Sequence, residues 1–500
     1  MAKQDPLDRP YGLSRLRRFL SNLRHGDVIV ANVGEGARDV VVGKNIIKIG
    51  TLNVPTLPVA VLLLVVFAAA ALTVWFFFVP AKMTGAFNVA VAEFGEVDAQ
   101  GHVHPSENGK RLSNWVFETL QNELGQLPGD LHASVWHDSL GPLRKRVTIG
   151  LVPDEASARQ RAEEIGADVL VYGNFRAGQN PADFVPRFYV RRIQGSANEL
   201  DDILGAHELG SPIPVRLPLN LSSDPVSRLA LNRKLGVRID ALAQVTAGLL
   251  YDLIGDSTTA LAIFQKANEE PGWDEQDGKE VLYYFIGKQY LFLNQLDKGK
   301  SVFEKALSLN PNYARAYIGL GGIYYDQAQN IQPVSERLKT DDLDNAIGQY
   351  QQALTLARSA KDHEVELSAH FALGSAYRLK GEAYVYLNQF DVADAWFTQT
   401  IQEIAAGREL ISPDEHRLLG IAYAVLGTAY HEKAHARLVQ GDRADSQNLF
   451  EQALAAYDQC IKEADAAPED QILADKVKAA SCVPYKQQVE DALAELKNTP

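Results

Sequence analysis

The sequence contains little cysteine and lacks most of the short motifs that mark common enzymes. Only Cys460 and Cys482 occur in 500 residues, so a disulfide framework and a CxxC zinc site are both excluded. The two thiols either pair outside the cytoplasm or stay reduced as small buried side chains, and the sequence leaves this open. No G-x-S-x-G, EF-hand or G-x-G-x-x-G motif is present. We therefore expect no cofactor and no enzyme of these classes.

Basic residues are scarce in most of the chain. The formal net charge is −14, from 49 Lys and Arg against 63 Asp and Glu. Residues 1–53 hold nine of the basic and five of the acidic residues, which leaves 40 basic and 58 acidic residues in the remainder. Because an acidic surface repels phosphate backbones, nucleic acid is excluded as a partner of this larger part. The hydrophobic content of 46% indicates a folded chain, and its length predicts two or three domains.

Residues 57–79, LPVAVLLLVVFAAAALTVWFFFV, lack charged side chains altogether. As a helix this segment would extend about 34 Å at ~1.5 Å per residue, enough to cross a bilayer core. A buried helix of a globular domain is usually shorter and more polar. A signal peptide would not follow 56 residues of chain, and no small-x-small cleavage site comes after the segment. We therefore predict a single, uncleaved transmembrane helix.

The charges on either side of this segment predict its orientation. Basic side chains gather before it, at Arg15, Arg17, Arg18, Arg24, Arg38, Lys44 and Lys48. After it comes Lys82, and then the acidic residues Glu93, Glu96 and Asp98. The positive-inside rule then places the N-terminus in the cytoplasm and residues 84–500 outside it, in a protein anchored once in the cell membrane.

The predicted cytoplasmic stub, residues 1–53, has two parts. Leu13, Leu16, Leu20 and Leu23 share one face of a basic amphipathic helix. Such a helix either lies on anionic headgroups or packs locally while its arginines enforce topology. Residues 26–50 alternate β-branched runs with glycine, which predicts two or three short strands. A phosphate-binding loop is excluded there, because its spacing is two residues too long and its final Ser or Thr is missing.

Residues 86–215 alternate between two kinds of segment. FNVAVAEFG, HASVWHDS, DVLVYGNFRA and RFYVRRI are typical of strands, whereas GKRLSNWVFETLQNELGQL and EASARQRAEEIGA are typical of helices. This alternation predicts a small α/β domain. Its order resembles the N-terminal α/β domain of TolB-like periplasmic proteins. His102 and His104 can face one side of a strand as metal ligands, but no third ligand is identifiable, which favours solvated histidines. Residues 216–240 are predicted to be a linker.

From residue 241 onward, small and aromatic residues recur at fixed helical offsets. The spacings 3, 9, 4 and 3 separate Gly248, Tyr251, Ala260, Phe264 and Ala267, and again Gly287, Tyr290, Gly299, Phe303 and Ala306. Small residues let two helices approach closely, and an aromatic ring fills the gap that this leaves. The pattern resembles the tetratricopeptide repeat (TPR), two antiparallel helices in 34 residues.

The resemblance implies an all-α superhelical solenoid over residues 241–465, with about five repeats. Later copies are irregular: an insertion of 13 residues follows Tyr324, and a first helix two turns too long carries Gly374 and Gly381. Residues 466–500 are predicted to form a capping helix with a polar outer face.

In this family a groove lined by the first helix of each pair commonly binds peptides or partner helices. The matching positions here are Tyr284, Lys288, Arg315, Ile318, Tyr325 and Arg378. Aromatic and cationic side chains suit an extended or acidic partner segment. The asparagines of the chaperone-type carboxylate clamp are replaced by Lys288, Gly322, Ser375 and Thr428, so capture of a C-terminal carboxylate is not expected.

One motif keeps an enzymatic alternative open. HEKAH, residues 431–435, matches H-E-x-x-H, in which His431 and His435 would bind zinc and Glu432 would act as general base. Against this, Lys433 places a charge at a position that is normally apolar in the zinc-binding helix of such peptidases. No downstream Gly/His extension of the motif follows. The motif also lies on a helix that the repeat pattern already accounts for. A chance match on a solvated helix face is therefore favoured over a zinc site.

The sequence therefore predicts a membrane-anchored scaffold or recruiter that binds a protein or peptide outside the cytoplasm and is not an enzyme. Two alternatives remain: a zinc metallopeptidase, and a transmembrane sensor that relays binding to the cytoplasmic stub. Partner identity, oligomeric state and biological process do not follow from the sequence.

Overall fold

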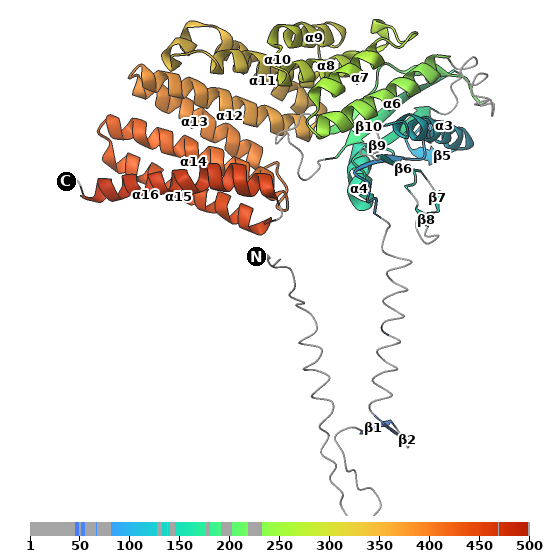
Figure 1. Cartoon of the computed structure of the whole chain (residues 1–500), viewed down its shortest axis with the longest axis horizontal. Helices are drawn as coiled ribbons and strands as arrows, with labels where there is room; N and C mark the ends of the chain where they lie inside the picture. Colours follow the sequence, from blue (N-terminus) through green and yellow to red (C-terminus); the bar gives the residue numbers. More distant parts are fainter. Residues whose placement is uncertain are drawn as a thin grey trace, which may run out of the picture. The chain divides into compact units, whose positions relative to one another are not determined.

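In the computed structural model of the protein, the chain splits into two units, residues 1–80 and 81–500, and Figure 1 shows the helices and strands of the second unit. It describes residues 46–49, 52–55, 67, 82–127, 133–137, 139–140, 146–147, 149–176, 181–191, 203–218, 233–468 and 470–498. In the first unit, strands β1 (Ile46–Ile49) and β2 (Leu52–Pro55) pair antiparallel with Ile49 opposite Leu52. Strand β1 lies within residues 26–50, where short strands are predicted, whereas β2 lies beyond that segment and residues 26–45 lie outside the described residues.

The predicted membrane helix, residues 57–79, lies outside the described residues except for Phe67. Within the described part of the chain, no helix is both long and apolar enough to span a bilayer. The predicted amphipathic helix of the stub also falls outside the described residues. Membrane anchoring therefore stays a prediction from the sequence.

A mixed eight-stranded sheet opens the second unit. Its strands are β3 (Phe87–Val91), β4 (Gly95–Val97), β5 (Val103–Pro105), β6 (Ala133–Trp136), β9 (Val169–Arg176), β10 (Ala182–Val190), β11 (Gly205–Glu208) and β12 (Ile213–Val215). Strand β3 lies between β6 and β9 and runs parallel to both, while β10 runs antiparallel to β9, β11 and β12. A separate short pair joins β7 (Ser139–Leu140) to β8 (Arg146–Val147). The sheet and its helices confirm the predicted α/β region.

Helices pack on both faces of this sheet, and the side chains that alternate along a strand contribute in turn to the two cores. Val89 and Val91 of β3 join the core that contains α3 (Glu107–Leu124). The neighbouring Ala90 joins the core that contains α4 (Glu155–Ile165). Both helices begin at side-chain caps, since Ser106 and Asp154 accept hydrogen bonds from the backbone N–H groups of Gly109 and Ser157.

Five consecutive helix pairs follow between residues 233 and 466. They are α6 (Arg233–Leu253) with α7 (Ser257–Asn268), α8 (Glu280–Phe292) with α9 (Leu296–Leu309), α10 (Ala314–Gln329) with α11 (Asp342–Ala360), α12 (His363–Tyr386) with α13 (Phe390–Arg408), and α14 (His416–Val439) with α15 (Arg443–Ala466). The insertion after Tyr324 forms the 3-10 helix η3 (Val334–Lys339). Helix α12 has 24 residues against 13 in α8, as the irregular fourth copy predicts.

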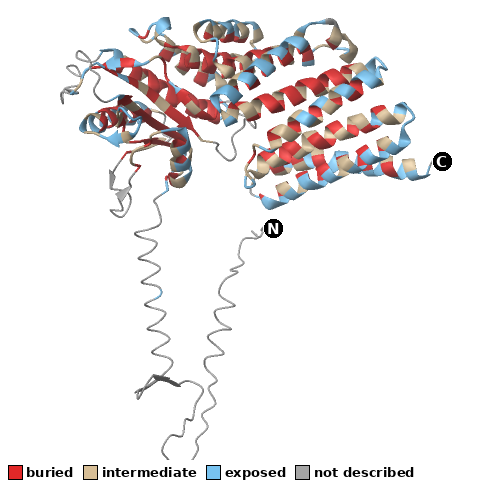
Figure 2. Ribbon diagram, turned by 180° about the vertical axis from the view of Figure 1, so that it is seen from behind, coloured by how far each residue is buried: buried red, intermediate tan, exposed pale blue. Residues whose placement is uncertain are grey.

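Glycines at helix contacts explain the repeated small–aromatic pattern. A Cβ atom added at Gly287 would lie 2.7 Å from the Phe303 ring, and one added at Gly427 would lie 2.5 Å from the Tyr457 ring. Any larger residue would therefore push the two helices of a pair apart. Figure 2 shows the outcome, with buried positions recurring along each helix and exposed positions between them.

The sheet and the first repeats share one hydrophobic core. It joins sheet residues such as Phe188 to solenoid residues such as Phe285 and Phe303. His207 of β11 stacks on Phe188 with ring centroids 5.0 Å apart and lies 5.3 Å from Phe285. The last repeats have a core of their own, which includes Phe450. The α/β region is thus built into the first half of the solenoid.

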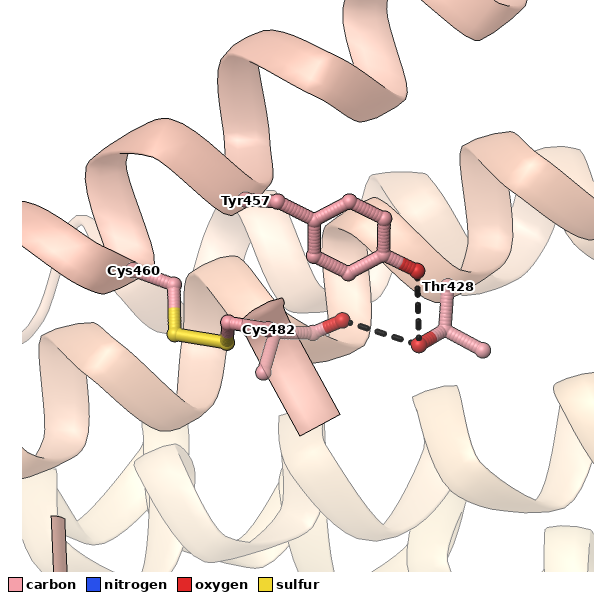
Figure 3. Close-up of a disulfide and its surroundings, with 5 residues drawn as sticks. Thr428, Tyr457, Cys460 and Cys482 are labelled. Atoms are coloured by element: carbon pink, nitrogen blue, oxygen red, sulfur yellow. Dashed lines mark hydrogen bonds between the residues drawn. A yellow bond between two sulfur atoms is a disulfide. The ribbon is translucent and has the colours of Figure 1, made fainter. Parts of the chain in front are cut away.

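A disulfide fastens the C-terminal end of the solenoid. After α15 the chain forms the π-helix η4 (Ile472–Cys482) and then α16 (Val483–Asn498). The turn back along α15 brings Cys482 to Cys460, with the two Cα atoms 6.4 Å apart, and the sulfur atoms are bonded (Figure 3). The alternative of two reduced buried thiols is therefore wrong. Beside the disulfide, the Tyr457 hydroxyl donates to Thr428 Oγ1 at 3.4 Å.

Candidate partner-binding site

Three of the six predicted groove residues are buried and do not face solvent. Tyr284 has no exposed surface, and Lys288 and Arg315 are each 5% exposed. The Tyr284 ring packs among Phe285, Phe303 and Tyr313. These three side chains therefore do not line an open groove, which the repeat register had predicted.

The reason is that the α/β region covers the first half of the groove. Arg315 donates one hydrogen bond to the backbone carbonyl of Leu204 at 2.8 Å and another to Asp362 at 2.7 Å. Gly205, at a φ of 90°, presses so closely on this site that an added Cβ would lie 3.0 Å from the Arg315 guanidinium. The chain itself thus occupies the surface that the repeat register assigns to a partner.

Lys288 is buried on α8. Burial is the main cause that lowers the pKa of its amine well below the usual value, and the positive charge of Arg315 adds to the effect. Its Nζ atom lies 5.4 Å from the ring centroid of Phe292. A lysine buried in this way is not available to an external acidic segment.

The other three predicted groove residues lie further along the solenoid. Ile318 and Tyr325 are partly buried and pack against the core formed by α11 and α12. Arg378 on α12 is 27% exposed and donates to Glu432 on α14 at 3.0 Å. Arg378 also lines a pocket at the last helix pair.

That pocket encloses about 500 Å³ and lies at the last helix pair. It is lined by Arg378, Ala424, Val425, Thr428, His431, Glu432, His435, Ser481, Tyr485 and Gln488. Helices α12 and α14 are first helices of their pairs, whereas η4 and α16 belong to the C-terminal cap. The cap thus forms one wall of the pocket, and the disulfide between α15 and η4 fixes that wall.

Two polar pairs define the chemistry of the pocket. Burial raises the pKa of Glu432 to about 6, although the nearby Arg378 opposes the shift. His431 and His435 face each other with their Nε2 atoms 3.0 Å apart. Burial, and secondarily His435, lowers the pKa of His431 to about 4, so this imidazole is neutral at pH 7. The walls therefore combine a balanced ion pair, neutral imidazoles and the apolar surfaces of Val425 and Tyr485.

The geometry does not support the zinc peptidase. Glu432 is directed to Arg378 in an ion pair, whereas a general base has to face the metal-bound water. A catalytic zinc also needs three protein ligands. Among the described residues, the one set of three such side chains whose ligand atoms lie within 4.8 Å of one another is Asp98, His102 and His104, far along the chain from the H-E-x-x-H motif.

Several residues of these sites were not predicted. Ser481, Tyr485 and Gln488 come from the cap, which lies outside the repeat register, so no periodic signal marks them. Asp98 lies beside His102 and His104 and offers a third potential ligand atom. The spacing Asp-x-x-x-His-x-His, with Gly101 in a predicted turn, was a signal that could have identified it.

Comparison with known proteins agrees with the repeat assignment. Residues 281–313 match the family model of the tetratricopeptide repeat. They include α9 and nearly all of α8, so this helix pair is a TPR unit of a helical, TPR-like solenoid.

Several solved structures are similar to about half of this chain. TTC0263, a thermophilic TPR protein of Thermus thermophilus, is 17% identical, with 48% of this chain and 98% of that chain covered and a TM-score of 0.29. MamA is 19% identical over 43% of this chain and 96% of that chain, with a TM-score of 0.28. YrrB, a TPR protein with an unusual peptide-binding site, is 15% identical over 49% and 100%, with a TM-score of 0.28. No match was found among curated proteins.

Proposed function

We propose that this protein is a membrane-anchored scaffold whose solenoid binds a partner protein or peptide outside the cytoplasm. The observation that carries the binding role is the pocket at the last helix pair, in a solenoid that contains a TPR unit. The first half of the groove is covered by the chain's own residues 203–209, so the partner engages the second half. TPR units are packing modules, and a solenoid of such modules presents extended surfaces for binding.

The partner segment would place an apolar side chain in the pocket. Val425 and Tyr485 supply apolar surface, and Gln488 and His435 at the exposed rim supply hydrogen-bonding groups. Because the Arg378–Glu432 pair is already balanced, a strongly acidic segment gains little here. This modifies the expectation of an acidic partner that Lys288 and Arg315 suggested.

A matched pair of substitutions on α14 tests the binding site. Val425→Arg would fill the pocket with a charged side chain, whereas Val439→Arg alters a valine of the same helix that is 64% exposed and outside the pocket. Both full-length variants are compared with the wild-type chain in a cross-linking pull-down from membranes. We expect a partner captured by the wild type to be retained by Val439→Arg and lost by Val425→Arg. Retention by both variants, with unfolding excluded by circular dichroism, would refute the pocket as the binding site.

The membrane anchor and the location outside the cytoplasm are part of the proposal. Support comes from the uncharged segment 57–79, from the basic residues before it, and from the Cys460–Cys482 disulfide, since such bonds persist mainly in oxidising compartments. A protease added to intact cells, or to spheroplasts where an outer membrane is present, should degrade the repeats and spare residues 1–53. Full protection of the repeats would overturn this location.

A further inference from the structure

A tight hairpin at the edge of the α/β region brings together three potential metal ligands. Strands β4 and β5 pair antiparallel, with Val97 opposite Val103 and Glu96 opposite His104. Asp98 directly follows β4, His102 directly precedes β5, and His104 lies within β5. Since His102 and His104 are two residues apart in extended chain, their side chains share one side of the hairpin with Asp98.

The three side chains are spaced as metal ligands are. The Oδ2 atom of Asp98 lies 2.9 Å from Nε2 of His104 and 3.5 Å from Nδ1 of His102. All three ligand atoms fall within 4.8 Å of one another. An ion that binds nitrogen and oxygen at about 2.0–2.1 Å in tetrahedral geometry needs ligand atoms about 3.4 Å apart. Small side-chain rotations would therefore complete such a site, and no backbone movement is needed.

Backbone contacts hold the carboxylate in place. Its Oδ1 atom accepts the N–H groups of Gln100 at 2.9 Å and His102 at 2.8 Å, which leaves Oδ2 directed at the imidazoles. The carboxylate is thus oriented before an ion arrives, which reduces the entropy lost on binding.

We propose that Asp98, His102 and His104 bind one divalent transition-metal ion of the Zn²⁺ class. Two imidazoles and one carboxylate suit zinc, cobalt, nickel or copper, whereas calcium and magnesium prefer all-oxygen sites. The side chains of His102 and His104 are 74% and 59% exposed. A fourth ligand therefore comes from water or from a bound molecule, and the site exchanges its metal with solvent.

Titration of the untagged full-length chain with Zn²⁺ by calorimetry tests this site. We expect His104→Ala, His102→Ala and Asp98→Asn each to weaken one binding event at least about tenfold, because removing a ligand costs more than removing an outer-shell partner. Titration with Co²⁺ gives a second readout, since its visible absorption depends on the number and geometry of its ligands. These substitutions lie on an exposed hairpin, and circular dichroism checks that the fold is retained.

Two controls separate this site from other histidines. His363→Ala removes a histidine side chain that is 68% exposed and remote in sequence, and it should leave Zn²⁺ binding unchanged. The double variant His431→Ala, His435→Ala removes the other close histidine pair and should leave the hairpin event intact. The proposal fails if the wild type binds no Zn²⁺, if the hairpin variants bind it as well as the wild type does, or if only the double variant loses it. In those cases Asp98 serves as an ion-pair partner of the two histidines.

Discussion

The two halves of the solenoid use the same helix packing to different ends. In the first half, α8 and α10 share a core with the sheet, and residues 203–209 cover the surface around Arg315. In the second half, α12 and α14 line an open pocket, and a disulfide holds the cap against it. Contacts such as Gly287 with Phe303 and Gly427 with Tyr457 are equivalent in both halves. What differs is whether the chain covers the surface that the repeats create or leaves a pocket there.

The strongest test of this difference compares two arginines. Arg315→Ala should lower the free energy of unfolding by about 3 kcal/mol or more, because it leaves buried partners without their cation. Arg378→Ala removes an ion pair whose two side chains are 27% and 28% exposed, so we expect about 1 kcal/mol or less. Urea unfolding followed by circular dichroism measures both. Equal losses would mean that the first half is no more closed than the second.

Reduction of the disulfide should affect the second half selectively. Cys460 and Cys482 are separated by 22 positions, and closing a loop of this size restricts the unfolded chain by about 3 kcal/mol. We expect a reducing agent to lower the thermal stability of α14–α16 and to leave the first half unchanged, as hydrogen exchange can resolve. The double variant Cys460→Ser, Cys482→Ser should not respond to the reductant. Equal loss of protection in both halves would contradict the division.

Overpacking should affect both halves alike. Gly287→Leu and Gly427→Leu each drive a side chain into an aromatic ring, and each should cost about 1–3 kcal/mol. Gly348→Ala in α11 is the control, because an added Cβ there meets no atom within 4 Å and alanine favours the helix. Melting temperatures of the three variants measure these changes in stability. A harmless Gly427→Leu beside a damaging Gly287→Leu would show that the packing rule does not extend to the last repeat.

The smallest expected effect is a pH dependence confined to the pocket. An unfolded histidine titrates near pH 6.5, whereas His431 in the folded chain has a pKa of about 4. Between these values the unfolded state binds more protons, so the free energy of unfolding falls as the pH falls. Glu432, with its raised pKa of about 6, acts in the opposite direction because its folded form takes up the proton first.

Substitution separates the two contributions. Between pH 7 and pH 5.5, wild type should lose about 1 kcal/mol more stability than His431→Gln, since Glu432 is present in both and its effect cancels. Urea unfolding at the two pH values measures the difference. An identical pH response in the two proteins would show that His431 is not the titrating group.

Local spacing predicted much of the fold, and long-range contacts account for what it missed. The offsets of Gly287 and Phe303 predict their contact, because a helix fixes which side chains share a face. The burial of Arg315 could not be predicted in this way, since Leu204 precedes it by 111 residues and belongs to a different fold element. Likewise, Tyr485 reaches the pocket only because η4 turns the chain back along α15.

Some predictions for the N-terminal part of the chain rest on other signals than residue spacing. The transmembrane helix and its orientation rest on composition and on flanking charge, and they stay predictions. So does the resemblance of residues 86–215 to TolB-like proteins, because strand order and generic small residues do not identify a family. The third ligand beside the two histidines was missed for a simpler reason, since Asp98 joins them only when the turn at residues 98–102 closes.

The core shared by the sheet and the first repeats sets an order of events during synthesis. Phe188 of the sheet leaves the ribosome roughly 100 residues before Phe285, its neighbour in that core. At elongation rates of about 5–20 residues per second, the apolar face of the sheet waits on the order of 5–20 s for the helices that cover it. During that interval the nascent chain exposes an apolar β surface, and such surfaces are prone to aggregation.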